Sequence, residues 1–311
     1  MSEDSLDRLA RDLRTYLKQR QETGVEWYLD EGPPDGAAPV AGEAATPSRE
    51  PAAAPAAPRQ PQPTEFETVC ERFVQDTLEQ IRQYRRQPTQ PQEQDMFAAP
   101  EDAPAASTPE QKAGALEALA AAVAACEACK LHPTRTNTVF GVGNPDAQLV
   151  FVGEAPGRHE DEQGEPFVGR AGKLLTDILN AIGFEREDVY ICNILKCRPP
   201  QNRDPELDEV RACEPNLKQQ LEILQPKVIC CLGRHAAMTL LDTRASLRNL
   251  REAVHFYEGI PVVATYHPAA LLRNPHWKRD TWDDVRKLRA LHDALCTDGS
   301  RATGTRAEDA T

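Results

Sequence analysis

The chain has 311 residues, enough for one to three domains, and a formal net charge of −13 at pH 7. This balance argues against broad, non-specific nucleic-acid binding, although most of the excess negative charge falls before residue 106. No apolar run reaches the length of a membrane span, and the N-terminus has no apolar signal core, so we expect a cytoplasmic protein. Its nine cysteines are then expected to be metal ligands or buried thiols, not disulfides.

The first third of the chain predicts little packed structure. Leucines at helical spacing predict an amphipathic helix within residues 1–30, which we interpret as a surface-docked or partner-binding helix. Residues 31–108 are rich in Pro, Ala and Gln and predict a disordered linker that allows a short helix at 65–86. The pentapeptide EQDMF, from Glu93 to Phe97, loosely resembles the segments by which bacterial DNA enzymes bind the sliding clamp, although it begins with Glu where Gln is usual.

Residues 109–296 predict one globular domain, followed by a disordered tail over 297–311. Strands are expected at 149–153, 189–194, 228–232 and 261–265, and helices at 110–125, 170–182, 205–224, 234–241 and 277–296. Strands that alternate with helices favour a parallel sheet covered on both faces. We therefore expect an α/β fold, a three-layer α/β/α sandwich with a central four-stranded parallel sheet.

The stretch VFVGEAPGRHEDEQGEPFVGRAG, residues 150–172, is the strongest candidate for a binding site. Ligands of open α/β sheets lie just beyond the carboxyl ends of strands. The turn that begins with Gly153, Glu154 and Ala155 exposes backbone N–H groups there, and it lets a flat ligand approach closely. Phe167 is the one aromatic residue of the loop that follows. An ordinary strand-to-helix loop explains the glycines equally well.

Four cysteines have a spacing typical of a metal centre. Cys126 and Cys129 form a CxxC pair at a helix end, Cys197 follows the second strand, and Cys213 lies in the next helix. Four thiolates can bind zinc or an iron–sulfur cluster, and the softness of sulfur does not choose between them. Scattered core cysteines are the alternative, because free Cys often packs as a small hydrophobe.

Two polar residues end strands at the same predicted edge. His267 follows the fourth strand and precedes a proline, and Asn193 ends the second strand. The Asn193 amide offers one donor and one acceptor, which matches the N3–H and O4 of uracil or the corresponding edge of another base. A structural histidine and a strand-end cap are the alternatives.

Long motifs in a fixed order resemble the type 4 uracil-DNA glycosylases, bacterial and archaeal enzymes that carry a [4Fe-4S] cluster. The matching stretches are GEAPG at 153–157, EPFVGRAG at 165–172, NILKCRPPQNR at 193–203 and YHPAALLR at 266–273. The order and spacing of the four cysteines also match. The resemblance covers about residues 109–296 and leaves residues 1–108 unexplained.

The resemblance implies a role for each matching residue of the uracil pocket. Phe167 would stack on the base, and Asn193 would read its Watson–Crick edge. His267 would stabilise the charge on the departing base. Gly153, Glu154 and Ala155 would line the pocket, and Glu154 is also a candidate for activating water, because Ala155 stands where better-known uracil glycosylases have Asp.

Outside the pocket, the resemblance implies a cluster and a DNA contact. The four cysteines would ligate a [4Fe-4S] cluster, and a loop of Leu271, Leu272 and Arg273 would press into the duplex. The implied activity is hydrolysis of the N-glycosidic bond of uracil in DNA, by a bacterial cytoplasmic protein expected to be monomeric. Two other classes stay open, namely a binding module without turnover and an α/β enzyme acting on a free nucleotide, although no Walker-type GxxxxGK[ST] loop is present.

Overall fold

The computed structural model describes residues 65–86 and 108–301. The predicted helix within residues 1–30, most of the linker with Glu93–Phe97, and residues 302–311 lie outside the described residues. The clamp contact and the monomeric state therefore stay predictions. Within the described ranges, no helix combines the length and apolar character needed to cross a bilayer.

The centre of the domain is a six-stranded mixed sheet with the order β1-β3-β2-β4-β6-β5. Its strands are β1 (Val142–Gly143), β2 (Leu149–Gly153), β3 (Tyr190–Asn193), β4 (Val228–Leu232), β5 (His255–Tyr257) and β6 (Ile260–Thr265). The four strands predicted from sequence are the parallel centre, β3-β2-β4-β6. The sequence analysis missed β1 and β5, which pair antiparallel at the two edges, because runs of two and three residues carry no periodicity.

Nine α-helices are described in these ranges. They are α2 (Glu65–Arg86), α3 (Pro109–Ala124), α4 (Arg158–Gln163), α5 (Arg170–Ala181), α6 (Leu207–Leu224), α7 (Arg234–Leu240), α8 (Leu247–Arg251), α9 (Pro268–Arg273) and α10 (Lys278–Arg301). Helix α3 begins after a capping box, in which the Thr108 hydroxyl accepts from the Gln111 N–H and the Gln111 side chain accepts from the Thr108 N–H. Helix α10 continues past the boundary predicted at residue 296.

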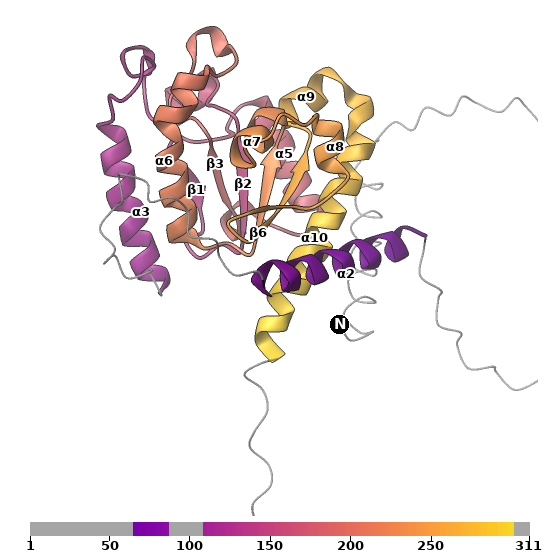
Figure 1. The fold of residues 1–311 in the computed structure, drawn as a ribbon. Coiled ribbons are helices and arrows are strands. Elements are labelled where there is room, and N and C mark those ends of the chain that lie inside the picture. The colour runs from indigo at the N-terminus through magenta and orange to yellow at the C-terminus, as the bar shows by residue number, and fades with distance from the viewer. Residues whose placement is uncertain (1–64, 87–107, 302–311) are drawn as a thin grey trace, which may run out of the picture. The chain divides into compact units, whose positions relative to one another are not determined.

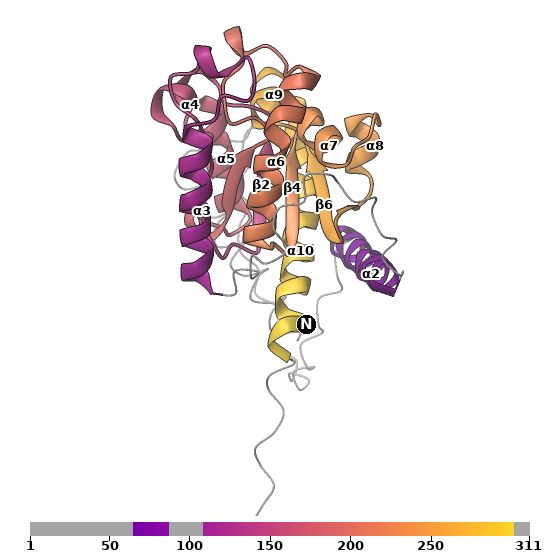
Figure 2. The same cartoon turned by 60° about the vertical axis from the view of Figure 1, so that its left-hand side comes forward.

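The strands are apolar on both faces, so helices cover the sheet from both sides (Figures 1 and 2). Val150 and Val152 of β2 point into a core shared with α3, α6, α7 and α8. The alternate residues Leu149 and Phe151 point into a second core shared with α5 and α10. This arrangement confirms the three-layer α/β/α sandwich.

Helix α2, over the residues where the sequence allowed a short helix, packs against α10 (Figure 1). The Arg286 guanidinium lies 3.5 Å from the centre of the Phe66 ring, and the Lys287 ammonium lies 5.5 Å from that of Phe73. Tyr84, near the other end of α2, stacks on Phe256 of β5 at 5.7 Å. These contacts join α2 to the domain away from the carboxyl ends of the parallel strands.

Those carboxyl ends lie at one edge, where α4, α7 and α9 gather in Figure 2. Residues 153–157, 193–203, 233–234 and 265–268 follow the four parallel strands at this edge. The fold therefore brings together stretches that lie far apart in the sequence.

Candidate active site

Asn193 and Gly153 lie side by side at the ends of β3 and β2, in direct register. The Asn193 side chain is 2 % exposed, and its Oδ1 is buried without a hydrogen-bond partner among the described residues. A Cβ on Gly153 would lie 2.3 Å from that Oδ1 and 2.7 Å from Cζ of Phe167. The absence of a side chain at Gly153 therefore leaves room beside Oδ1 of Asn193, an acceptor that a hydrogen-bond donor would satisfy.

Phe167 is held in the site by unusual backbone geometry. Its φ is +55°, and a Cβ on Gly172 would lie only 1.7 Å from the Phe167 carbonyl oxygen. The Glu160 carboxylate of α4 accepts from the N–H groups of Val168 and Gly169 at 3.1 and 3.0 Å. Glu160 therefore fixes the loop that carries the aromatic ring, a role that the sequence analysis missed.

His267 is the N-cap of α9 and faces Phe167. The Ala269 N–H donates to Nδ1 of His267 at 3.1 Å, so the neutral ring carries its proton on Nε2. The two rings lie 5.4 Å apart with a tilt of 32°. Burial lowers the pKa of His267 to about 4, with Arg273 acting in the same direction and Glu160 opposing it. His267 is therefore a neutral hydrogen-bond donor at physiological pH.

This lowered pKa predicts a specific pH dependence of stability. Between about pH 4 and the ordinary value of 6.5, the unfolded state binds more protons at His267 than the folded state, so stability rises with pH across this window. Acidification from about pH 7 to about pH 5 should therefore destabilise the wild-type protein more than His267→Asn, which keeps a capping side chain. Urea unfolding of both proteins at the two pH values measures the difference; equal losses would contradict the lowered pKa.

Glu154 follows Gly153 at the end of β2, next to half-buried Ala155. Its Oε2 is 3.8 Å from Nδ1 of His235, whose Nε2 is 3.6 Å from Asp204. Burial raises the pKa of Glu154, whereas the nearby charges of His235, Arg234 and Arg273 lower it. A carboxylate with a raised pKa beside an imidazole is a reasonable acceptor for a proton from water, and His235 was not among the residues predicted from sequence.

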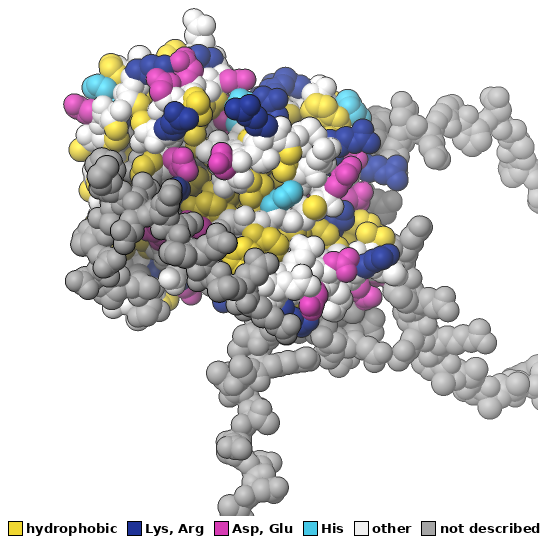
Figure 3. Space-filling model, viewed as in Figure 1, with side chains coloured by type: hydrophobic (Ala, Val, Ile, Leu, Met, Phe, Trp, Pro, Cys, Tyr) yellow, Lys and Arg dark blue, Asp and Glu magenta, His cyan; other side chains and the backbone are white. Residues whose placement is uncertain are grey.

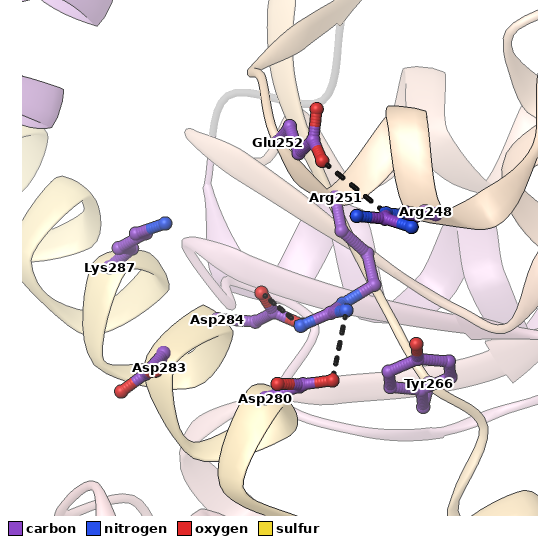
Figure 4. A pocket seen from close by; sticks show the side chains of 8 residues that line it. All are labelled: Arg248, Arg251, Glu252, Tyr266, Asp280, Asp283, Asp284 and Lys287. Carbon is purple, nitrogen blue, oxygen red and sulfur yellow. Dashed lines mark hydrogen bonds and ion pairs between the residues drawn. The ribbon is translucent and has the colours of Figure 1, made fainter. Parts of the chain in front are cut away.

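The end of β6, which delivers His267, is fixed by a buried ion pair (Figure 4). The Arg251 guanidinium contacts both oxygens of Asp284 at 2.6 and 3.2 Å, and the Thr265 hydroxyl donates to the same carboxylate at 2.7 Å. Tyr266 lies between the Arg251 guanidinium, 4.3 Å from its ring centre, and the Trp277 ring at 4.6 Å. Arg251, Tyr266 and Asp284 line a cavity of about 430 Å³ beside α10, and the contacts of Arg251 and Asp284 hold the two residues before His267.

Asp284→Asn should therefore destabilise the domain by about 3–5 kcal/mol, because the largely buried charge of Arg251 would lose its closest carboxylate and keep only the 3.6 Å contact with half-exposed Asp280. Denaturant unfolding measures this loss. The double variant Arg251→Met with Asp284→Leu should recover much of it, since it leaves no buried charge without a partner. A single variant as stable as wild type would contradict the role of the ion pair.

All four cysteines predicted as ligands line one small cavity between α3, the segment after β3, and α6. Hydrogen-bond donors point at the sulfurs, since Arg135 Nη1 lies 3.3 Å from the Cys197 sulfur and the Lys196 N–H lies 3.3 Å from the Cys213 sulfur. Burial raises the pKa of both thiols, and these donors lower it. In the part of the chain that the structure describes, no group of three or more His, Cys, Asp or Glu side chains is placed to hold a single metal ion.

The predicted DNA-contacting loop is a helix, which corrects one assignment. Leu271 is 1 % exposed and packs inward from α9, so it cannot press into a duplex in this arrangement. Leu272, which is 38 % exposed, and Arg273 face solvent in the last turn of α9. Figure 3 shows Lys and Arg side chains along the same end of the molecule, above α7 and α9. Exposed Arg234 begins α7 and exposed Arg273 ends α9.

Comparison with known proteins agrees with this geometry. A sequence model described as "Uracil DNA glycosylase superfamily" matches residues 140–286. The type-4 uracil-DNA glycosylase of Archaeoglobus fulgidus is 50 % identical over 177 residues, covering 54 % of this chain and 89 % of that protein. The chain belongs to the type 4 uracil-DNA glycosylase family. The type-4 enzyme of Thermotoga maritima is 45 % identical over 94 % of its length, and the type-5 enzyme of Thermus thermophilus 31 % identical over 71 %.

Within this type 4 family member, four of the residues predicted for the pocket, Gly153, Asn193, Phe167 and His267, form one group. Glu154 and Ala155 follow Gly153 in the chain, and Ala155 packs against the core shared with α3 and α6. The sequence analysis assigned no role to the supporting residues, and of these only Lys196 lies within a matching motif that it quoted. They are Glu160, His235, Arg251, Asp284 and, between the pocket and the cysteines, Lys196.

Proposed function

We propose that this chain excises uracil from DNA by hydrolysing its N-glycosidic bond, which leaves an abasic site for base excision repair. The observation that carries the proposal is the buried, unpartnered Oδ1 of Asn193 beside Gly153. An unpaired buried acceptor costs roughly 1–3 kcal/mol, so it favours a ligand that donates a hydrogen bond there. The N3–H of uracil is such a donor, while cytosine has an acceptor at N3.

The neighbouring groups suit the rest of the reaction. A base in DNA must leave the stack to be reached, and stacking on Phe167 would return about 1–3 kcal/mol of the cost. Uracil departs with negative charge at O2, and the Nε2–H of neutral His267 would stabilise that charge as it develops. Because His267 is neutral beforehand, it needs no proton from solvent to act as a donor.

Water must then add to the sugar, which has oxocarbenium character. Ala155 provides no carboxylate, so we assign proton acceptance to Glu154, the carboxylate that borders the pocket. Its raised pKa and its contact with His235 support this role. Leu272 and Arg273, exposed at the end of α9, would contact the DNA beside the flipped nucleotide.

The four cysteines would hold a [4Fe-4S] cluster. Zinc needs all four sulfurs about 2.3 Å from one ion, whereas each thiolate of a cluster binds its own iron, so the sulfurs surround a larger body. The four sulfurs around one cavity agree with such an arrangement. The donors from Arg135 and Lys196 suit thiolates. The cluster would tie α3, the segment after β3, and α6 together.

An excision assay tests the proposed function. Purified protein of measured iron content is incubated with a labelled oligonucleotide that contains one uracil, and alkali then cleaves abasic sites. We expect cleavage only at the uracil and none in a matched strand with thymine at that position. Failure of iron-loaded protein to cleave either strand would overturn the proposal in favour of a binding module.

A further inference from the structure

Lys196 is a fully buried lysine that none of the roles above uses. Its side chain is among the least exposed in the domain, at 1 %. A buried ammonium is costly unless all its donors are satisfied, and here each has an acceptor. Nζ donates to the Asn193 carbonyl oxygen at 2.8 Å, to the Phe140 carbonyl oxygen at 3.1 Å and to Oε1 of Gln220.

The backbone of the same residue reaches the cysteine cavity. The Lys196 N–H donates to the Cys213 sulfur at 3.3 Å, and the next residue is Cys197. The Lys196 carbonyl accepts from the Val139 N–H at 2.8 Å. Lys196 thus contacts the surroundings of the cysteines through its main chain and Asn193 through its side chain.

Gln220 extends this connection to α6. Its Nε2 donates to the Phe140 carbonyl oxygen at 3.0 Å and to the Tyr190 hydroxyl at 3.2 Å, while its Oε1 accepts from Lys196. Helix α6 therefore supplies both Cys213, at the cavity, and Gln220, under β3. The ends of the network are buried, so solvent does not replace its hydrogen bonds.

Asn193 is the residue that these contacts position. Its amide must be held within about 0.5 Å of the position that reads a base, yet its Oδ1 has no hydrogen-bond partner in the described part of the chain. The contact from Lys196 fixes the peptide plane that follows Asn193, and the Ile194 N–H donates to the Gly153 carbonyl at 3.0 Å on the other side. The backbone at Asn193 is thus fixed from two directions.

We propose that Lys196 is the positioning residue for base recognition. Its ammonium holds the Asn193 carbonyl beside the Phe140 carbonyl and Gln220, and its backbone N–H anchors the same segment beside the cysteines. This inference rests on the proposed function, because it assumes that Asn193 reads uracil. It goes further in that it assigns to Lys196, which contacts the Cys213 sulfur and the Asn193 carbonyl, a role in recognition of the base.

The test compares Lys196→Met with Lys112→Met. Lys112 is also a buried lysine of this domain, but its ammonium contacts Asp146 at 2.6 Å and the Leu224 carbonyl at 3.1 Å, away from Asn193. Both variants lose a buried cation, so a merely structural role predicts similar effects. The readouts are the affinity for free uracil by calorimetry, the iron content and the melting temperature of the full chain.

We expect Lys196→Met to bind free uracil about tenfold or more weakly at unchanged iron content, and Lys112→Met to lose stability but keep its uracil affinity. Adding Lys196→Met to Asn193→Ala should cost no further affinity, because both act through one amide. If Lys196→Met does not fold, Lys196→Arg decides, since it keeps the charge but changes the donor geometry and should bind uracil more weakly than wild type.

Wild-type affinity in the folded Lys196 variant, equal losses in the two methionine variants, or additive losses with Asn193→Ala would overturn the inference. If any of these results is obtained and the wild-type protein still excises uracil, the proposed function stands. A wild-type protein that neither binds nor excises uracil would overturn both.

Discussion

Replacing His267 by alanine should lower the rate of uracil excision by about 10²–10³-fold or more, with the domain still folded. The neutral imidazole is the donor placed to meet charge on the departing base, and alanine leaves that charge without a partner. The N-cap of α9 is lost as well, at a cost of about 1 kcal/mol in stability. Single-turnover excision at saturating protein measures the chemical step apart from product release.

His255→Ala is the matched control for this prediction. His255 is also a partly buried histidine with one backbone contact, from Nε2 to the Leu250 carbonyl at 3.0 Å, but it lies on β5. Its removal should leave excision near the wild-type rate. A His267→Ala rate within a few-fold of the control would remove His267 from the chemistry.

Replacing Cys197 by alanine should abolish iron binding and leave the domain poorly folded. Cys197 lines the cavity with the three other cysteines, and its loss removes one of the four proposed cluster ligands. The cavity joins three segments far apart in sequence, and metal-binding energy contributes directly to folding in such sites. We expect a colourless protein with a melting transition that is much lower or absent.

Cys230→Ala is the control, because Cys230 is just as inaccessible but packs in β4 away from the cavity. It should keep its iron and lose only the stability expected for a small core truncation. Iron analysis, visible absorbance and thermal unfolding distinguish the two variants. A folded Cys197→Ala protein with full iron content would contradict the assignment of this ligand.

The residues that meet at the candidate site were predictable because each lies in a stretch with a strong local signal. Continuous apolar runs predicted the four parallel strands, and their carboxyl ends placed Gly153, Asn193 and His267 at one edge. The topology needed no further information, since parallel strands joined by helices put these ends together. What the pattern could not provide was the distance between side chains.

The supporting residues were not predictable because their roles depend on tertiary contacts. Glu160 lies in an acidic stretch interpreted as a loop, and only the folded chain brings its carboxylate to the backbone beside Phe167. Leu271 was predicted to contact DNA, yet α9 turns it into the core. In a helix this short, the sequence does not tell which of two adjacent leucines faces inward.

Gly153 is a position at which base recognition can be lost while the fold is kept. Its backbone is not in the left-handed region, so alanine meets no conformational barrier there, and the obstacle is the space beside Asn193 and Phe167. A methyl group at this position displaces the recognition groups and leaves the strand pairing intact. Gly153→Ala should therefore inactivate the protein without unfolding it. In this variant, surface binding of DNA can be studied with the pocket closed.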